Sequence, residues 1–493
     1  MARAAALWAR LALAGAAVGA VVGILGGCAM LAPPVPLPPR EAPALDAPAT
    51  WPAPPIPPSA TPAATRQPLP EGWTQFDDPL LLELLAAAQA ASPDLAAARS
   101  RIEQARASSV AAGALLLPTL DANGSASTGR AETGLPRASF ATVNLQASWE
   151  LDLFGANRAG SDAALAQLLG AQASAAALRI AVAAETASSY NALRGCEAVV
   201  LRTEADARSR AETARLTELV AQAGLSAPAT AALARASAAQ GRSLLAGQKA
   251  QCELLFKSLV ELTALDDAAL RQRLQPGHAL LPTSAAIAVP SVPGAALMQR
   301  ADLLAAAQQV VAAAAQTEQA QARRYPRVAI GGLIGPAWMR VESVSADATL
   351  WTIGPLQVSL PLFDGGTRAA NVVAERARYD AAVSAYRAAV RTALREVQAA
   401  LITLDATTRR IADTQASIEG FEASLRAADA RFRAGLGSLF DLEDARRSAL
   451  VAQSTLVELQ REQVAAWINL YRALGGGFSR ATDLAAAGGA PIR

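Results

Sequence analysis

The sequence predicts a mainly α-helical fold combined with a membrane β-barrel, with four strands per chain and two tandem structural repeats. Three observations lead to this fold class. The 493 residues are 52% apolar but only 4% aromatic, and the excess is largely alanine, which favours long, closely packed helices. Some segments alternate strictly between apolar and polar residues, as strands with two different faces do. Landmark residues recur at a nearly constant offset of 208 to 211 residues.

The amino terminus has the features of an export signal. Arg3 and Arg10 supply positive charge, and residues 11–25 form an uncharged run that is short for a membrane-spanning helix. The run ends in Leu25-Gly26-Gly27-Cys28, which resembles a bacterial lipobox. We therefore expect a signal peptide over residues 1–27 and a covalent lipid on Cys28; the alternative is an ordinary signal peptide and a chance cysteine. Because Ala29 stands where many lipoproteins of the inner membrane have aspartate, we expect sorting to the outer membrane.

The next segment, residues 28–72, is dense in proline and alanine and shows neither a helical nor a strand period. Such a segment cannot bury a core and favours extended conformations. We expect it to be a tether between the lipid and the folded body.

Composition excludes several functions. The formal net charge is only +2, so no strong field favours nucleic acid. His278 is the single histidine, which argues against zinc binding and histidine-based catalysis, and its Pro-Gly neighbourhood predicts a surface loop. We expect no metal and no cofactor other than the lipid.

The repetition divides the body into two halves, residues 73–285 and 286–477, followed by a tail over 478–493. Each half contains the same four landmarks in the same order. They are an aspartate that opens a helical run, a proline before a strand-like region, a phenylalanine at the end of that region, and a glycine at the end of a long helical stretch. The corresponding pairs are Asp94 and Asp302, Pro118 and Pro326, Phe154 and Phe363, and Gly224 and Gly435. Landmarks in the same order at similar spacing predict two structurally equivalent repeats.

Four strands are expected, near residues 118–130, 138–153, 326–340 and 349–363. From Val143 to Leu153 the odd positions are apolar and the even positions polar. In the second repeat the phase changes across Gly354-Pro355, where a bulge would restore it. A strand of a soluble β-sandwich could alternate in the same way.

No apolar stretch long enough for a membrane-spanning helix is evident after Cys28, so we expect the strands to cross the membrane. Four strands leave open edges, which a bilayer does not tolerate. One chain therefore cannot close a barrel, and three copies would supply about twelve strands.

Two proline-free runs, from Gly155 to Gly224 and from Gly366 to Gly435, each predict a helix of roughly 100 Å. In the second run, apolar residues from Tyr379 onward recur at spacings of three and four, which predicts supercoiled packing between helices. An ordinary coiled coil would show the same stripe. The expected hairpin tips, centred near 224 and 435, are Gly224, Leu225 and Ser226, and Gly435, Leu436 and Gly437. The hairpins would span about 155–264 and 366–474.

Cys196 and Cys252 lie 28 residues before and after Gly224, so an antiparallel hairpin would place them opposite one another. Export to an oxidising compartment makes a disulfide plausible. The alternative is two buried free thiols.

Several motifs resemble those of the TolC-like outer membrane factors. They are Trp149-Glu150-Leu151-Asp152-Leu153-Phe154-Gly155, Phe363-Asp364-Gly365-Gly366, Arg431-Phe432-Arg433-Ala434-Gly435 and Leu470-Tyr471-Arg472-Ala473-Leu474-Gly475-Gly476-Gly477. The lipoprotein (NodT-like) branch, which serves resistance-nodulation-division pumps, is the most similar. The resemblance covers residues 73–477 and implies a homotrimer with a twelve-stranded barrel, a long periplasmic helical barrel and a closed lower end.

The resemblance also implies a periplasmic gate formed by Asp444, Arg431 and Phe432. The family's usual aromatic residue is tyrosine, and Phe432 lacks its hydroxyl group. Three copies of Asp444 around a threefold axis would form a carboxylate ring that attracts cations. The alternative is that Asp444 only pairs with a nearby arginine such as Arg447.

The implied function is that of an outer-membrane exit duct in a tripartite efflux system, which conducts small molecules passively. Its partners would be a periplasmic adaptor protein, contacting the hairpin tips, and an inner-membrane resistance-nodulation-division transporter. The alternative within this class is the outer-membrane conduit of a type I protein secretion system. An enzyme would need a feature such as a phosphate-binding loop, a zinc-ligand spacing or a histidine for a catalytic triad, and we find none of these in the sequence. A purely structural coiled-coil lipoprotein would share the helices but would not need the alternating strands.

Overall fold

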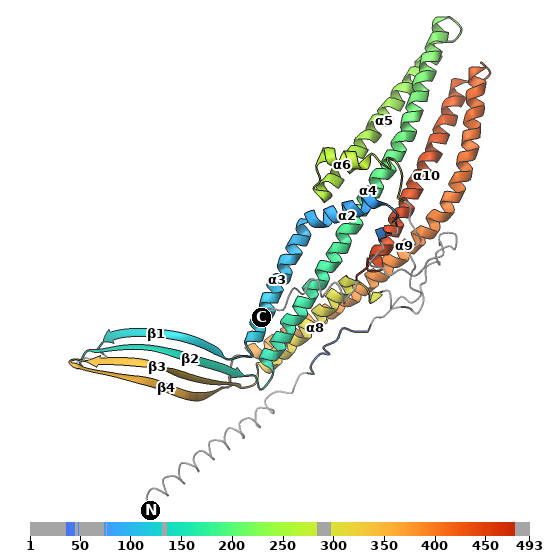
Figure 1. Ribbon diagram of the computed structural model, residues 1–493. Helices are drawn as coiled ribbons and strands as arrows, with labels where there is room; N and C mark the ends of the chain where they lie inside the picture. Colours follow the sequence, from blue (N-terminus) through green and yellow to red (C-terminus); the bar gives the residue numbers. More distant parts are fainter. Residues whose placement is uncertain are drawn as a thin grey trace, which may run out of the picture. The chain divides into compact units, whose positions relative to one another are not determined.

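Four antiparallel strands form one sheet in the order β1-β2-β3-β4 (Figure 1). The computed structural model describes residues 36–44, 48, 73–74, 76–130, 136–282 and 297–478. The strands are β1 (Thr119–Gly129), β2 (Ala138–Leu151), β3 (Arg327–Val341) and β4 (Val344–Ser359). The expected signal peptide, Cys28, most of the tether and residues 479–493 lie outside the described residues.

The register places the apolar residues of adjacent strands on one face. Trp149 pairs with Ile330, which pairs with Leu356; likewise Leu145 pairs with Ile334, which pairs with Trp351. On the opposite face, polar residues meet across the strands. Ser125 and Thr142 are hydrogen-bonded at 2.8 Å, and Arg327 forms an ion pair with Glu150.

The predicted bulge in the second repeat is confirmed. Gly332 pairs with Ile353 and Ile330 pairs with Leu356, so two steps along β3 correspond to three along β4. The extra residue lies at Gly354-Pro355. It restores the two-residue period and brings Ile353 and Leu356 to the same face. The strand β4 begins at Val344, five residues before the expected start near 349, because it pairs with β3 as far as the tight turn.

Long helices follow the strands directly. After β2, the helix α4 (Ala156–Gln222) begins five residues beyond Leu151, and after β4 the helix α9 (Thr367–Arg433) begins eight residues beyond Ser359. Each has 67 residues, which corresponds to about 100 Å. The sequence expectation of two matching long helices is therefore confirmed.

Shorter helices complete the two halves. The returning arms are α5 (Pro228–Thr263) and α10 (Leu439–Ala473), and Figure 1 shows α4 beside α5 and α9 beside α10. The helices that precede the strands are α3 (Pro93–Ala114) and α8 (Ala301–Ala322). Within the described ranges, the remaining helices are α2 (Pro79–Ala91) and α6 (Asp267–Leu274). His278 lies in an exposed turn, as expected.

The chain divides into two compact units that do not coincide with the two repeats. One unit holds all four strands, within 103–168 and 307–385, and the described residues up to Pro43. The other holds 44–102, 169–306 and the chain from Tyr386 onward. Each unit draws on both repeats, and in the strand-bearing unit β2 of the first repeat hydrogen-bonds to β3 of the second.

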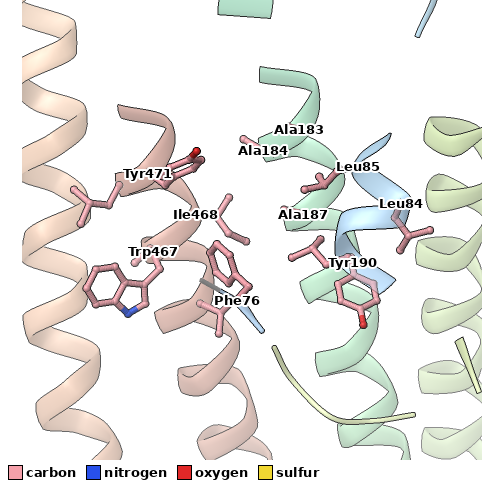
Figure 2. Close-up of a cluster of buried hydrophobic side chains, with 14 of the residues drawn as sticks. Phe76, Leu84, Leu85, Ala183, Ala184, Ala187, Tyr190, Trp467, Ile468 and Tyr471 are labelled. Atoms are coloured by element: carbon pink, nitrogen blue, oxygen red, sulfur yellow. The ribbon is translucent and has the colours of Figure 1, made fainter. Parts of the chain in front are cut away.

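The helical unit has a core of apolar side chains from α2, α4 and α10. Ile468 and Phe76 lie between α10 and α4, near Ala187 and Tyr190 (Figure 2). These residues are almost completely buried, and each large apolar side chain contributes about 1.5–3 kcal/mol. The alanine side chains of α4 are small and leave room beside this helix. The aromatic side chains of α10 fill that room.

The expectation that no helix-length apolar segment follows Cys28 is wrong for α4. This helix contains an 18-residue window with a mean hydropathy of 1.3, and α2 and α3, which meet at 52°, pass the same test only as a pair. The reason is alanine, which raises hydropathy in a helix whether or not the helix faces lipid.

Candidate gate and hairpin tips

Both hairpin tips use the same glycine-based helix end. Gly224 and Gly435 adopt φ values of 73° and 72°, in the left-handed region. At the first tip, Leu225 N donates to Val220 O at 3.0 Å and Gly224 N donates to Ala221 O at 2.9 Å. This pair of bonds defines the Schellman motif. The second tip repeats it, with Leu436 N donating to Arg431 O at 2.8 Å.

The two tips present one apolar side chain each. Leu225 is 80% exposed and Leu436 is 75% exposed, whereas Ser226 and Gly437 are partly buried. A Cβ atom on Gly437 would lie 3.2 Å from the backbone nitrogen of Phe432, so the turn is tight at this position. The sequence expectation that these residues form the tips agrees with the structure; their contact with an adaptor stays a prediction.

The arms that follow the tips start differently. In the second hairpin, Ser438 caps α10 and forms a capping box with Asp441, which satisfies two backbone donors. In the first hairpin, α5 begins with Pro228 at its first position and has no side-chain cap. The ring of Pro228 fixes the backbone φ angle near its helical value, and proline has no backbone N–H group that would need a partner.

Asp444 lies on the exposed side of α10, eight residues beyond the tip residue Leu436. Its carboxylate forms an ion pair with Arg447, one turn further along, and both side chains are about two-thirds exposed or more. Asp444 also lines a cavity together with Arg431 from α9 and Asp441. Within the described part of the chain, Asp444 therefore pairs with Arg447, and it shares a cavity rather than an ion pair with Arg431.

Phe432 has a structural environment of its own. It packs against a small apolar cluster that joins the two hairpins and is made of Ala214, Ala234, Ala238, Leu439 and Leu442. An aromatic ring without a hydroxyl group suits this dry contact. The gate role of Asp444, Arg431 and Phe432 stays a prediction.

Beside this cluster lies a polar network that sequence reasoning missed. Arg210 of α4 donates to Asp206 at 2.7 Å, to Ser237 of α5 at 2.8 Å and to Glu443 of α10 at 2.7 Å. Arg446 of α10 donates to the other oxygen of Glu443 at 2.9 Å. The network therefore joins α4, α5 and α10.

One signal in the sequence could have revealed it. Leu439, Leu442, Arg446 and Ala449 follow the three-and-four spacing of a buried helix face, and all four are buried. An arginine at a core position of such a stripe requires buried polar partners. One partner of Arg446, Glu443, lies on the same helix, but the other, Thr213 of α4, comes from the other repeat, so the stripe alone would not have identified both.

Cys196 of α4 and Cys252 of α5 form a disulfide, with their Cα atoms 5.6 Å apart. The bond cross-links the two arms of the first hairpin. No cysteine occurs at the corresponding place in the second hairpin.

Two buried arginines fix irregular segments beside the helical core. Arg194 is 1% exposed and donates to the carbonyl groups of Leu274 and Pro276, at 2.9 and 3.1 Å. Arg300 donates to the carbonyl of Ala473 at 2.8 Å, at the end of α10, and pairs with Asp302 and Glu396. Desolvation opposes the charge of Asp302, but the adjacent Arg300 holds the pKa of this carboxyl below its usual value.

A sheet with one apolar face, joined directly to paired long helical hairpins, defines a class of membrane channel subunits. The family model described as outer membrane efflux protein matches residues 84–264 and 292–476. The chain belongs to the outer membrane efflux protein family, as its motifs predicted.

Relatives and solved structures agree with this assignment. The solvent efflux pump outer membrane protein SrpC of Pseudomonas putida is 28% identical, covering 83% of this chain and 88% of the relative. Nodulation protein T of Rhizobium leguminosarum bv. viciae is 27% identical, with coverage of 83% and 84%.

Among solved structures, the outer-membrane channel OprN has a TM-score of 0.77 at 27% identity, covering 89% of this chain and 99% of its own. The outer membrane protein VceC of Vibrio cholerae has a TM-score of 0.72 at 27% identity, covering 84% and 100%. The predicted fold class is confirmed, and the protein is an outer-membrane efflux channel component.

Proposed function

We propose that this chain is one subunit of the exit duct of a tripartite efflux system, through which small molecules leave the cell passively. The observation that supports this most strongly is the direct connection between membrane strands and long helices, which occurs in both repeats. A solute moving outward through a space lined by these helices would continue directly into a barrel formed by the strands that adjoin them. Energy and choice of cargo would come from an inner-membrane transporter of the resistance-nodulation-division class.

The sheet supports assembly as a homotrimer. Among the described residues, β1 pairs only with β2, and β4 pairs only with β3, so each has one open edge. The strands have 11 to 16 residues, enough for a membrane-spanning strand, which needs about 9–11. Pairing β4 of one copy with β1 of the next would remove both edges, and three copies would close a twelve-stranded barrel.

The apolar face of the sheet would then face lipid. Ile353 is 85% exposed and Leu356 is 62% exposed in the single chain, and these residues belong to one face. Exposed apolar surface of this extent is costly in water and favourable in hydrocarbon. A lipid on Cys28 would add a second attachment to the outer membrane.

The hairpin tips would contact the adaptor protein. Leu225 and Leu436 are exposed apolar residues at the ends of rigid glycine-capped turns. Such residues can enter a groove of a partner at little conformational cost. Three copies of Asp444, near the second tip, would form the cation-attracting constriction in the trimer, with Arg431 and Phe432 beside it.

The test is conductance of the full-length, membrane-extracted protein in planar bilayers, combined with its mass in solution. We expect trimers and a pore that opens to a discrete conductance. A monomer, or a trimer without any pore, would contradict the channel proposal.

A further inference from the structure

A described part of the tether, residues 36–43, lies against the helices of the strand-bearing unit. Arg40 donates from Nη1 to Asp162 of α4 at 2.6 Å and from Nε to both carboxylate oxygens of Glu318 of α8 at 2.8 Å. Its Nη2 also contacts Glu318. Pro38 is buried, and Arg376 of α9 donates to the carbonyl of Pro36 at 3.4 Å. This stretch of the tether is therefore bound to three helices.

The contact lies close to the strands. Asp162 follows the end of β2 at Leu151 by eleven residues (162 − 151), and Glu318 precedes the start of β3 at Arg327 by nine (327 − 318). At about 1.5 Å per helical residue, each carboxylate lies within roughly 15–20 Å of the sheet along the chain. One carboxylate belongs to the first repeat and the other to the second.

At this level α4 and α8 are closely packed. The side-chain amide of Gln319 on α8 lies over Gly160 of α4, where an added Cβ atom would come within 2.3 Å of Nε2. The close approach brings Asp162 and Glu318 to the same guanidinium. Two carboxylates placed this near one another repel unless a cation lies between them. Arg40 is that cation, and its planar fork can bind both carboxylates at once.

The side chains are not deeply buried, but the contact is extensive. Arg40 is 45% exposed, Asp162 40% and Glu318 only 17%. The hydrogen bonds to Glu318 and Asp162 raise the pKa of Arg40 above its usual value, so the guanidinium stays charged. Solvent weakens each single ion pair, whereas a contact shared by three charged groups is harder to replace with water.

We propose that Arg40 is a positioning residue that fastens the tether to α4 and α8 and joins these two helices, one from each repeat, where they meet the strands. The occupant of this surface is the chain's own tether. Cys28 precedes Arg40 by twelve residues (40 − 28), a reach of at most about 40 Å. The lipid would therefore be held within about 40 Å of this contact. This last consequence rests on the proposed lipidation, but the contact of Arg40 does not.

The test uses the full-length protein carrying a spin label at Leu37→Cys, a position that is 54% exposed. Cys196 and Cys252 are bonded to one another and stay unlabelled without reductant. We expect an immobilised label in the parent protein. Arg40→Gln should increase the mobile fraction at least severalfold, Asp162→Asn with Glu318→Gln should reproduce this change, and Arg40→Lys should give an intermediate value. Arg433→Gln, which removes an exposed ion pair within α9, is the matched control and should leave the label immobile.

Two results would overturn the proposal. An Arg40→Gln spectrum identical to that of the parent would show that Arg40 does not hold the tether. A mobile label in Cys28→Ala with Arg40 intact would show that the lipid, rather than the arginine, orders this segment. Hydrogen exchange across residues 156–168 gives a second measure, because release of Arg40 should speed exchange in α4 there. Mass spectrometry of the amino-terminal peptide tests lipidation separately, so a missing lipid would remove the anchoring consequence and leave the Arg40 contact intact.

Discussion

Arg446 of α10 donates a hydrogen bond from Nη2 to the hydroxyl group of Thr213 of α4, at 2.7 Å, and both side chains are buried. The bond connects the second hairpin to the first. Arg446 also binds Glu443, which in turn accepts from Arg210 of α4. The hairpins are therefore joined near their tips by buried and partly buried charged groups as well as by apolar packing.

Replacing Arg446 should destabilise the protein markedly. Arg446→Ala removes a buried charge from a core position and leaves Glu443 and Thr213 with fewer partners, at a cost of about 2–4 kcal/mol. Arg447→Ala, on the exposed side of the same helix, should change stability by less than about 0.5 kcal/mol. Thermal unfolding of both variants, monitored by circular dichroism at one scan rate, gives the two unfolding midpoints for comparison. Equal midpoints would show that the inter-hairpin contact contributes no more than a surface ion pair.

Asp444→Ala should raise the passive conductance of the reconstituted pore. The substitution removes three carboxylates from the proposed constriction and frees Arg447 in each copy. Asp429→Ala is the matched control, because Asp429 pairs with Arg433 within α9 and is not a proposed gate residue. Single-channel recordings should compare the closed-state conductance of the parent protein with that of each variant. A closed state unchanged by Asp444→Ala would remove Asp444 from the gate.

Loss of the disulfide should destabilise the first hairpin. Cys196 and Cys252 are separated by 56 residues, for which the loop-entropy model gives about 4 kcal/mol, an upper value because any structure kept by the unfolded chain already restricts the loop. We expect a lower unfolding midpoint for Cys196→Ala with Cys252→Ala, and a similar decrease for the parent protein in reductant. The double variant itself should not respond to reductant. A response of the same size in the double variant would contradict this account.

The glycines of the second hairpin allow a comparison of backbone conformations. Gly435 has φ 72° and Gly420 lies inside α9, and an added Cβ meets nothing within 4 Å at either position. Gly435→Ala should destabilise by about 1 kcal/mol because alanine is strained in the left-handed region. Gly420→Ala should stabilise by up to about 1 kcal/mol through helix propensity. Calorimetry of the two variants should give shifts of opposite sign, and shifts of the same sign would exclude the conformational explanation.

Stability at alkaline pH should depend on Tyr190. Burial raises the pKa of its phenol from 10.0 to about 12, and the hydroxyl donates to Asp78 at 2.7 Å. Because the folded state keeps the proton that the unfolded state releases, this contribution is complete below pH 10 and is lost as the pH rises towards about 12. Denaturant unfolding across this range should show a steeper loss for the parent than for Tyr190→Phe. Parallel pH profiles would contradict the assignment.

Much of the fold could be predicted from local sequence patterns. Alternation from Val143 to Leu153 predicted β2, and the phase change at Gly354-Pro355 predicted the bulge that the register of β3 and β4 shows. The spacing of Cys196 and Cys252 about Gly224 placed them opposite one another. These features were accessible because the period of a strand, the rise of a helix and the position of a turn depend on residues near one another in the chain.

The candidate site was less accessible. Sequence reasoning selected Asp444 but left open whether Arg447 pairs with it, and it did not identify Arg210, Glu443 or Arg446. The partners of these charges are far apart in the sequence, and their choice depends on which helix faces meet. A hydropathy pattern cannot give that information, because it shows that an arginine occupies a core position but not which distant residue pairs with it.

The sequence by itself determined the two repeats, the four strands, the two long hairpins and their glycine-capped tips, because each follows from short-range periodicity and conformational preference. Tertiary structure decided that strands from both repeats join in one sheet, that Arg446 of the second hairpin binds Thr213 of the first, and that Arg40 of the tether binds Asp162 and Glu318. The physical reason is that hydrogen bonds and ion pairs are selected by the packing of distant helices, which brings each charge to the partner that compensates its desolvation.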